Sequence, residues 1–155
     1  MKLTLLAVGD RMPGWAEEAT AEYLKRLPRE ARMTLVTVKP EKRAGQPAEA
    51  IKALEATRLM EKIPAGSRLV ALDEHGRQVS TRELADLLAR WLEMGKDTVL
   101  VIGGADGLAA DLLERAEARV ALSRLTLPHA LARVLVAEQV YRAVSLLHNH
   151  PYHRE

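Results

Sequence analysis

Short apolar runs alternate with helical patterns along the whole chain, and this alternation limits the fold more than any other feature. The runs are KLTLLAV at 2–8, MTLVTV at 33–38, RLVALD at 68–73, TVLVIGG at 98–104 and RVALS at 119–123. The fourth run is apolar throughout, which is typical of a strand buried on both faces. Strands that alternate with helices form a mostly parallel sheet covered by helices on both faces. A chain of 155 residues buries one core, so we predict a single α/β domain over 1–155.

The clearest helix start lies after the third run. Ser80 and Glu83 have the spacing of a capping box, in which each side chain accepts a free backbone N–H of the other residue. Apolar residues then follow at helical spacing, at Leu84, Leu87, Leu88, Trp91 and Leu92. The other helices are expected between Ala16 and Leu27 and near 48–63, 108–117 and 130–147.

Composition excludes several classes of protein. The chain has no cysteine, so disulfides, thiolate nucleophiles and cysteine-based metal sites are ruled out. No apolar run approaches the ~20 residues of a membrane span, and MKLTLLAVGD is too short and too alternating for a signal peptide. We therefore expect a cytoplasmic protein that does not enter a membrane.

Three segments follow predicted strands, where ligands bind in open α/β sheets. They are LDEHG at 72–76, IGGADG at 102–107 and LSRLTLPH at 122–129. The glycines of the second segment allow a tight turn and a close approach of the backbone to a ligand. The pattern is neither the dinucleotide fingerprint nor a Walker A motif, and no acidic residue stands where a ribose partner is expected. A ligand loop and a purely structural turn are both compatible with it.

The last predicted helix carries a polar stripe opposite an apolar arc. Pro128 suits its first turn, because proline has no N–H to leave unpaired. The stripe consists of Glu138, Tyr141, Arg142 and Ser145. A helix with one core face and one solvent face accounts for Glu138 and Ser145, but less well for a Tyr–Arg pair before a histidine-rich tail.

The tail holds three of the five histidines in its last eight residues. These are His148, His150 and His153, with Tyr152 and Arg154 among them. Pro151 prevents the helix from continuing, so 148–155 must leave it. A metal site is one interpretation, although the usual zinc spacings differ. A disordered terminus and a tail that docks into an active site are the others.

The order of these segments resembles one family. LDEHG, IGGADG, LSRLTLPHALARVLVAEQVYRA and NHPYHRE occur in a chain that begins MKLTLLAVG and has MPGW at 12–15. This pattern is similar to the ribosomal RNA large subunit methyltransferase H family, pseudouridine N3-methyltransferases of 23S rRNA in the SPOUT class. The resemblance covers the whole chain and is most specific in TLPH, RVLVAEQVYRA and NHPYHRE.

The resemblance implies a fold and a cofactor. The fold is a parallel sheet whose C-terminal part forms a deep trefoil knot, and the cofactor is S-adenosylmethionine (SAM), bound bent by three loops. The positions that match the cofactor site are Leu72, Gly103, Gly104, Leu122, Ser123, Arg124, Leu125, Thr126 and Leu127. Such a site holds adenine mostly through main-chain groups, which suits loops with few charged side chains.

The resemblance also implies that the tail is a catalytic lid near the methyl group, completed by a partner subunit. The catalytic residues would be His129, Arg142, Tyr152, His153 and Arg154. The N3 proton of pseudouridine must leave, and a histidine with a pKa near 6.5 suits that task. His129, a tail histidine or a bound water is the candidate base. The arginines would stabilise the uracil oxygens or hold a phosphate, and the tyrosine would stack on the base or bond to it.

The expected partners are a second copy of the chain and 23S rRNA in the assembled ribosome, without a metal. A net charge of +2 and a pI near 9.0 permit an RNA partner without demanding one. The basic stretches KRLPREAR at 25–32 and KPEKR at 39–43 are either solvated surface or RNA contacts. The alternatives are methylation of another RNA and a noncatalytic ribosome-binding factor.

Overall fold

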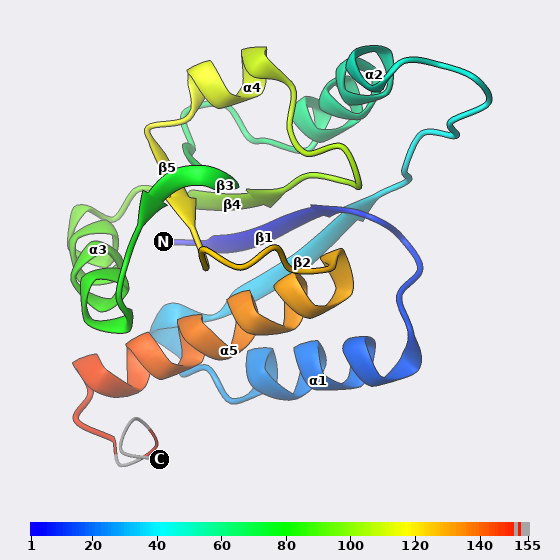
Figure 1. Cartoon of the computed structure of the whole chain (residues 1–155). Coiled ribbons are helices and arrows are strands. Elements are labelled where there is room, and N and C mark those ends of the chain that lie inside the picture. Colours follow the sequence, from blue (N-terminus) through cyan, green and yellow to red (C-terminus); the bar gives the residue numbers. More distant parts are fainter. Residues whose placement is uncertain (151, 153–155) are drawn as a thin grey trace.

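The structure, a computed structural model, describes residues 1–150 and 152 (Figure 1). The strands are β1 (Leu3–Val8), β2 (Met33–Val38), β3 (Arg68–Gln78), β4 (Thr98–Ile102) and β5 (Ala118–Ala121). The helices are α1 (Gly14–Lys25), α2 (Ala48–Glu61), α3 (Thr81–Met94), α4 (Ala110–Arg115) and α5 (His129–Leu147), with a short 3₁₀ turn η1 (Arg29–Ala31). Each predicted strand and helix is present.

All five strands form one parallel sheet in the order β2-β1-β4-β3-β5. The sheet confirms the predicted α/β class. Because every neighbouring pair is parallel, the carboxyl ends of the strands point to the same edge, where the loops that follow them gather. The trefoil knot implied by the resemblance stays a prediction.

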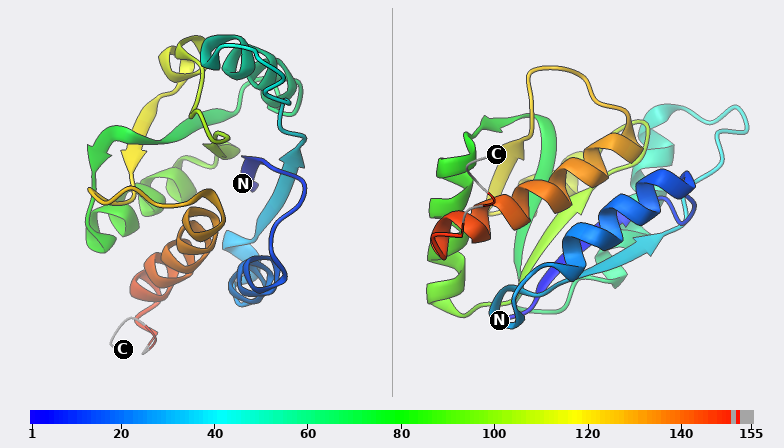
Figure 2. Two further views of the ribbon diagram at one scale, coloured as in Figure 1. Left: turned by 45° about the vertical axis from the view of Figure 1, so that its right-hand side comes forward. Right: turned by 90° about the horizontal axis from the view of Figure 1, so that it is seen from below.

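Helices cover both faces of the sheet (Figures 1 and 2). Successive residues of a strand point to opposite faces, so β4 contributes to two cores. Leu100 faces α1, α3 and α5 and packs with Leu88 and Val140. Val101 faces α2 and α4 and packs with Leu59 and Leu112. The uninterrupted apolar run at this strand reflects burial on both sides, as predicted.

The third strand is longer than predicted. We expected it to end at Asp73 and LDEHG to form a loop, but β3 continues to Gln78 with an irregularity between Leu72 and Arg77. Its second half is mostly exposed, so no apolar pattern marked it in the sequence. Gly76 permits the close pairing with β5, because a Cβ there would lie 2.7 Å from the carbonyl carbon of Arg119.

The capping box of α3 is confirmed. Ser80 Oγ accepts the N–H of Glu83 at 3.1 Å, and Glu83 Oε1 accepts the N–H of Ser80 at 2.9 Å. Gly95 ends the helix in the left-handed conformation, with φ of 71°. The capping box fixes where α3 begins, and Gly95 fixes where it ends.

Candidate active site

A cavity of about 760 Å³ lies where the carboxyl ends of β4 and β5 meet the irregular part of β3. All three segments that were predicted to hold a ligand line it. The lining includes Leu72, Gly103, Gly104, Leu122, Ser123, Leu125, Thr126, Leu127 and His129. Arg124 is absent from the lining. A volume of this size is typical of cofactor and small-molecule sites, which span roughly 300–1,000 Å³.

The glycine loop after β4 folds back on itself at the wall of this cavity. Gly107 donates its N–H to the carbonyl of Gly104 at 3.0 Å, and its φ of +86° is one that side chains rarely tolerate. A Cβ on Gly103 would lie 2.6 Å from the carbonyl carbon of Gly107. The segment is therefore a tight turn that also lines the cavity, and its role in holding a ligand stays a prediction.

His129 begins α5 and is held at the cavity by its neighbours. Its Nε2 lies 3.1 Å from Nη2 of Arg133. Because a guanidinium can only donate, Nε2 is the acceptor and Nδ1 carries the ring proton. Burial and the charge of Arg133 hold the pKa of His129 below its ordinary value, opposed by a hydrogen bond to the backbone of Gly103. The lowered pKa favours the neutral imidazole, whose Nε2 lone pair accepts the hydrogen bond from Arg133.

Arg133 was not among the predicted site residues. It is buried, and its Nη2 also donates to the carbonyl of Gly9 at 2.9 Å. Burial lowers the pKa of its guanidinium. This side chain ties the end of β1 to the start of α5. The signal available in the sequence was an arginine one turn after His129, in a helix that is otherwise mostly apolar.

Arg142 in the second half of α5 and Tyr152 after the helix, both predicted to be catalytic, lie against each other. Glu138 accepts hydrogen bonds from Arg142 Nε at 2.8 Å and from the hydroxyl of Tyr152 at 3.1 Å. The hydrogen bond with Glu138 raises the pKa of Arg142. Burial raises the pKa of Tyr152, as do hydrogen bonds with Tyr23 and Glu138. The guanidinium of Arg142 also lies 4.9 Å from the centre of the Tyr152 ring.

The cavity and this tail cluster are separate within one chain. Neither Arg142 nor Tyr152 lines the cavity. From His129 to Glu138 the helix advances about 14 Å at 1.5 Å per residue. His129 thus lies at the larger cavity with eight of the nine predicted cofactor positions. Arg142 and Tyr152 lie together at Glu138, away from the cavity. His153 and Arg154 lie outside the described residues.

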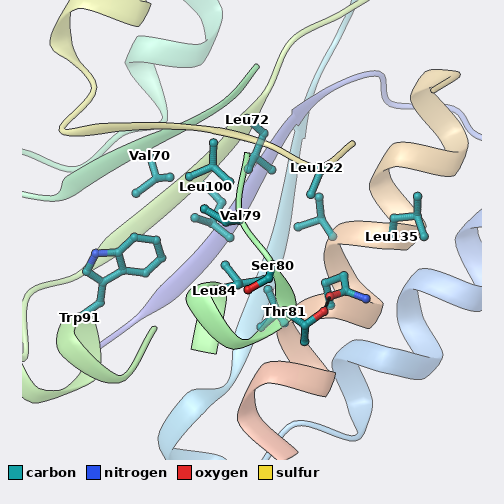
Figure 3. Close-up of a pocket in the computed structure, with 14 residues that line it drawn as sticks. Val70, Leu72, Val79, Ser80, Thr81, Leu84, Trp91, Leu100, Leu122 and Leu135 are labelled. Carbon is teal, nitrogen blue, oxygen red and sulfur yellow. Dashed lines mark hydrogen bonds between the residues drawn. The ribbon is translucent and has the colours of Figure 1, made fainter. Parts of the chain in front are cut away.

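A second, smaller cavity of about 290 Å³ lies between α3, α5 and the sheet (Figure 3). Its walls are mostly apolar and include Trp91 and Leu135. Leu72 and Leu122 line both cavities, so their side chains form the boundary between the two. On one side Thr81 donates to the side-chain oxygen of Gln139 at 2.7 Å. The smaller cavity provides apolar space beside the segments that line the larger one.

Within residues 1–150 and 152, no group of three histidine, aspartate or glutamate side chains is arranged to hold a metal ion. None of the helices described combines the length and apolar character needed to cross a bilayer.

A cavity formed by the carboxyl-end loops of a parallel sheet, with a glycine turn in its wall, is the geometry of a small-molecule site in an open α/β protein. A family model described as "Predicted SPOUT methyltransferase" matches residues 1–153. The chain belongs to this family and is therefore a methyltransferase of the SPOUT class.

Similar proteins narrow the family further. The chain is 57% identical to a ribosomal RNA large subunit methyltransferase H from Laribacter hongkongensis, over 100% of both chains. It is 51% identical to the protein of that name from Nitrosomonas eutropha, over 99% of both. The chain thus falls within the methyltransferase H family. A solved structure of a probable methyltransferase from Bordetella pertussis Tohama I shares the fold, with a TM-score of 0.58, 20% identity and coverage of 92% of this chain and 95% of that one.

Proposed function

We propose that this protein transfers a methyl group from SAM to N3 of a pseudouridine in 23S rRNA on the assembled ribosome, in the cytoplasm. The observation that carries the proposal is the cavity where three strand-end segments meet. Of the nine positions that match the family's cofactor site, all except Arg124 line it. The names of relatives that are 57% and 51% identical over almost their whole length support rRNA as the substrate.

The cavity suits a cofactor with a flat apolar ring and a charged amino-acid end. Leu72, Leu122 and Leu127 offer apolar surface for adenine, and the glycine turn brings main-chain groups close to the ligand. Lys52 and Asp73 also line the cavity and can pair with the carboxylate and amine of SAM. The sulfonium of SAM makes the methyl carbon electrophilic, so the protein's task is chiefly to align it with the nucleophile.

The base that removes the N3 proton is a residue of the tail or a bound water, and not His129. His129 has its Nε2 lone pair occupied by Arg133 and is buried beside the glycine loop. A proton acceptor needs a free lone pair within reach of its substrate. In this proposal His129 holds Gly103 in place. Tyr152, Arg142, Arg154 and His153 contact the nucleotide, with His153 or a water as the base.

The proposed active protein is a homodimer in which the tail of one subunit completes the cavity of the other. The support is the separation within one chain, since Tyr152 packs against Glu138 and not at the cavity. Two-fold symmetry would bring two such pairs together.

The test is transfer of labelled methyl from SAM to ribosomes that lack the modification. The full chain is compared with one truncated after Pro151 and with Gly104→Val. We expect label in 23S rRNA only with the full chain, unchanged SAM affinity for the truncated chain and loss of SAM binding for Gly104→Val. Label in another RNA would contradict the substrate. SAM binding without transfer to any RNA would favour a noncatalytic ribosome-binding factor.

A further inference from the structure

Glu55 of α2 is a buried carboxyl group with an unsatisfied oxygen. Its residue is 4% exposed. Oε2 accepts the backbone N–H of Glu41 at 3.0 Å, whereas Oε1 has no hydrogen-bond partner among residues 1–150 and 152. Desolvation raises the pKa of this carboxyl group above its ordinary value. Burial of a carboxyl group without full hydrogen bonding destabilises a protein, so stability alone does not explain a glutamate here.

The carboxyl group lies directly against the cofactor loop. A Cβ built on Gly104 would lie 2.9 Å from Oε1 and 3.1 Å from Oε2 of Glu55. Gly104 lines the larger cavity, but Glu55 does not. The glutamate therefore supports the glycine loop from behind, and any side chain at position 104 would displace one or the other.

The same carboxyl group connects the glycine loop to the segment 39–43. Arg58 donates to the carbonyl of Lys39 at 2.9 Å and also pairs with Glu41, which fixes this segment on α2. Arg43 pairs with Asp106 of the glycine loop at 2.6 Å. The ion pair joins the two loops at their exposed side, and Glu55 joins them in the interior.

We propose that Glu55 is a positioning residue of the cofactor pocket, holding the glycine loop and the segment 39–43 in the arrangement that binds the methyl donor. It touches neither substrate nor cofactor and acts through Gly104. The inference rests on the proposed function only in taking this cavity as the SAM site. It explains why a polar group occupies an interior position where an apolar one would pack without an unpaired oxygen.

The test compares Glu55→Ala, Glu55→Asp and Glu55→Gln with the wild type. We measure SAM affinity by calorimetry, KM and kcat for methyl transfer, and unfolding by urea. Glu55→Ala and Glu55→Asp should weaken SAM binding about tenfold or more, because a loop displaced by a fraction of an ångström loses its fit. KM for SAM should rise in parallel, with kcat at saturating SAM within about twofold of the wild type. Glu55→Gln keeps the length and an acceptor oxygen and should restore the affinity.

Leu59→Ala is the matched control. Leu59 is buried on the same helix and packs in the core beneath α2, and it is not among the three atoms nearest to a Cβ at Gly104. This variant should lose stability but keep the SAM affinity of the wild type. Equal weakening of SAM binding in Leu59→Ala and Glu55→Ala would reduce Glu55 to a structural residue and overturn the inference.

A double-mutant cycle tests the contact itself. Gly104→Ala places a methyl group against the carboxyl group, and Glu55→Ala removes that obstacle. The loss of SAM affinity in the double variant should be smaller than the sum of the two single losses. Additive losses would overturn the inference, as would wild-type affinity in Glu55→Asp. If the wild type binds SAM but methylates no rRNA, only the proposed substrate fails, and the affinities still decide the role of Glu55.

Discussion

At Gly103 the space that a side chain would need is already filled by backbone. A Cβ there would lie 2.6 Å from both the carbonyl carbon and the oxygen of Gly107. Backbone cannot move aside as a flexible side chain can, so Gly103→Ala must open the turn. We predict that this variant loses SAM affinity by about 100-fold or more, the cost typical of a misplaced positioning group. Calorimetric titration of the variant with SAM measures the effect.

Gly14→Ala provides the control for this prediction. A Cβ at Gly14 would meet no atom within 4 Å, and the residue begins α1. Alanine there loses less backbone entropy on folding than glycine, so stability should stay the same or rise by about 0.5–1 kcal/mol. Unchanged SAM binding is expected. A Gly103→Ala variant that bound SAM as Gly14→Ala does would show that the turn does not shape the pocket.

The buried carboxyl group of Glu55 leads to a second prediction at the residue scale, which concerns how stability depends on pH. Burial raises the pKa of Glu55 in the folded state, so the folded protein favours the protonated form. The contribution of Glu55 to stability is therefore largest below the unfolded pKa of about 4.3, and it is lost as the pH rises from there through the folded pKa. Glu55→Gln cannot ionise and escapes this loss. It should be more stable than the wild type at pH 7, with the difference shrinking as the pH falls toward 4.

Urea unfolding at pH 7 and at pH 4.5 checks this prediction. Glu49→Gln is the control, since Glu49 lies on the same helix with its side chain largely exposed. A difference between Glu55→Gln and the wild type that did not change with pH would contradict the assigned cause.

Residues of the site differ in how far the sequence predicts them. The glycine pattern predicted a tight turn at Gly103 and Gly104, which the structure contains, whereas their role as cofactor positions came from the family resemblance and stays a prediction. Arg133 and Glu55 were not predicted from the sequence. The pattern of α2 explains Glu55 as a surface residue, and the only signal for Arg133 was its place in a mostly apolar helix. Both are buried where a segment from elsewhere in the chain packs on them. Local patterns do not contain such contacts.

At the scale of elements, the capping box makes the start of α3 testable. Ser80→Ala removes the acceptor for the N–H of Glu83 and leaves the first turn of the helix with an unpaired donor. We predict a loss of about 1 kcal/mol in the free energy of unfolding. Urea denaturation measures it. Thr57→Ala, in the interior of α2 and exposed, should change stability by less than about 0.5 kcal/mol. Equal losses in both variants would mean that the box does not stabilise α3.

The positions of helices and strands were predicted better than which of their residues face the interior. The bounds of β2 and most of α5 agree with the predicted ranges, because periodic apolar residues mark them. Ser145 was interpreted as part of a polar stripe, yet it is buried and donates to the carbonyl of Arg142 at 2.7 Å. A serine that bonds its own helix can face the interior, and the sequence does not reveal which choice it makes.

At the scale of the whole molecule, α5 sets the distance between the larger cavity and the tail. The helix has 19 residues and so extends about 28 Å, with the cavity at its first turn and the tail beyond its last. Tyr152 returns only as far as Glu138, near the middle of the helix. A chain that keeps this arrangement cannot bring its own Tyr152 to its own cavity, which is why the proposed active site needs two subunits.

Complementation between two inactive variants tests this sharing. One chain carries Gly104→Val and keeps its tail; the other is truncated after Pro151 and keeps its cavity. In a mixed dimer the cavity of the truncated chain meets an intact tail, so one of two sites is complete. Random pairing makes half of the dimers mixed, and we predict about a quarter of wild-type methyl transfer from co-expressed chains. Each variant alone should give none. If every tail served its own cavity, the mixture would stay inactive although both chains fold and pair, and the two-subunit site would be wrong.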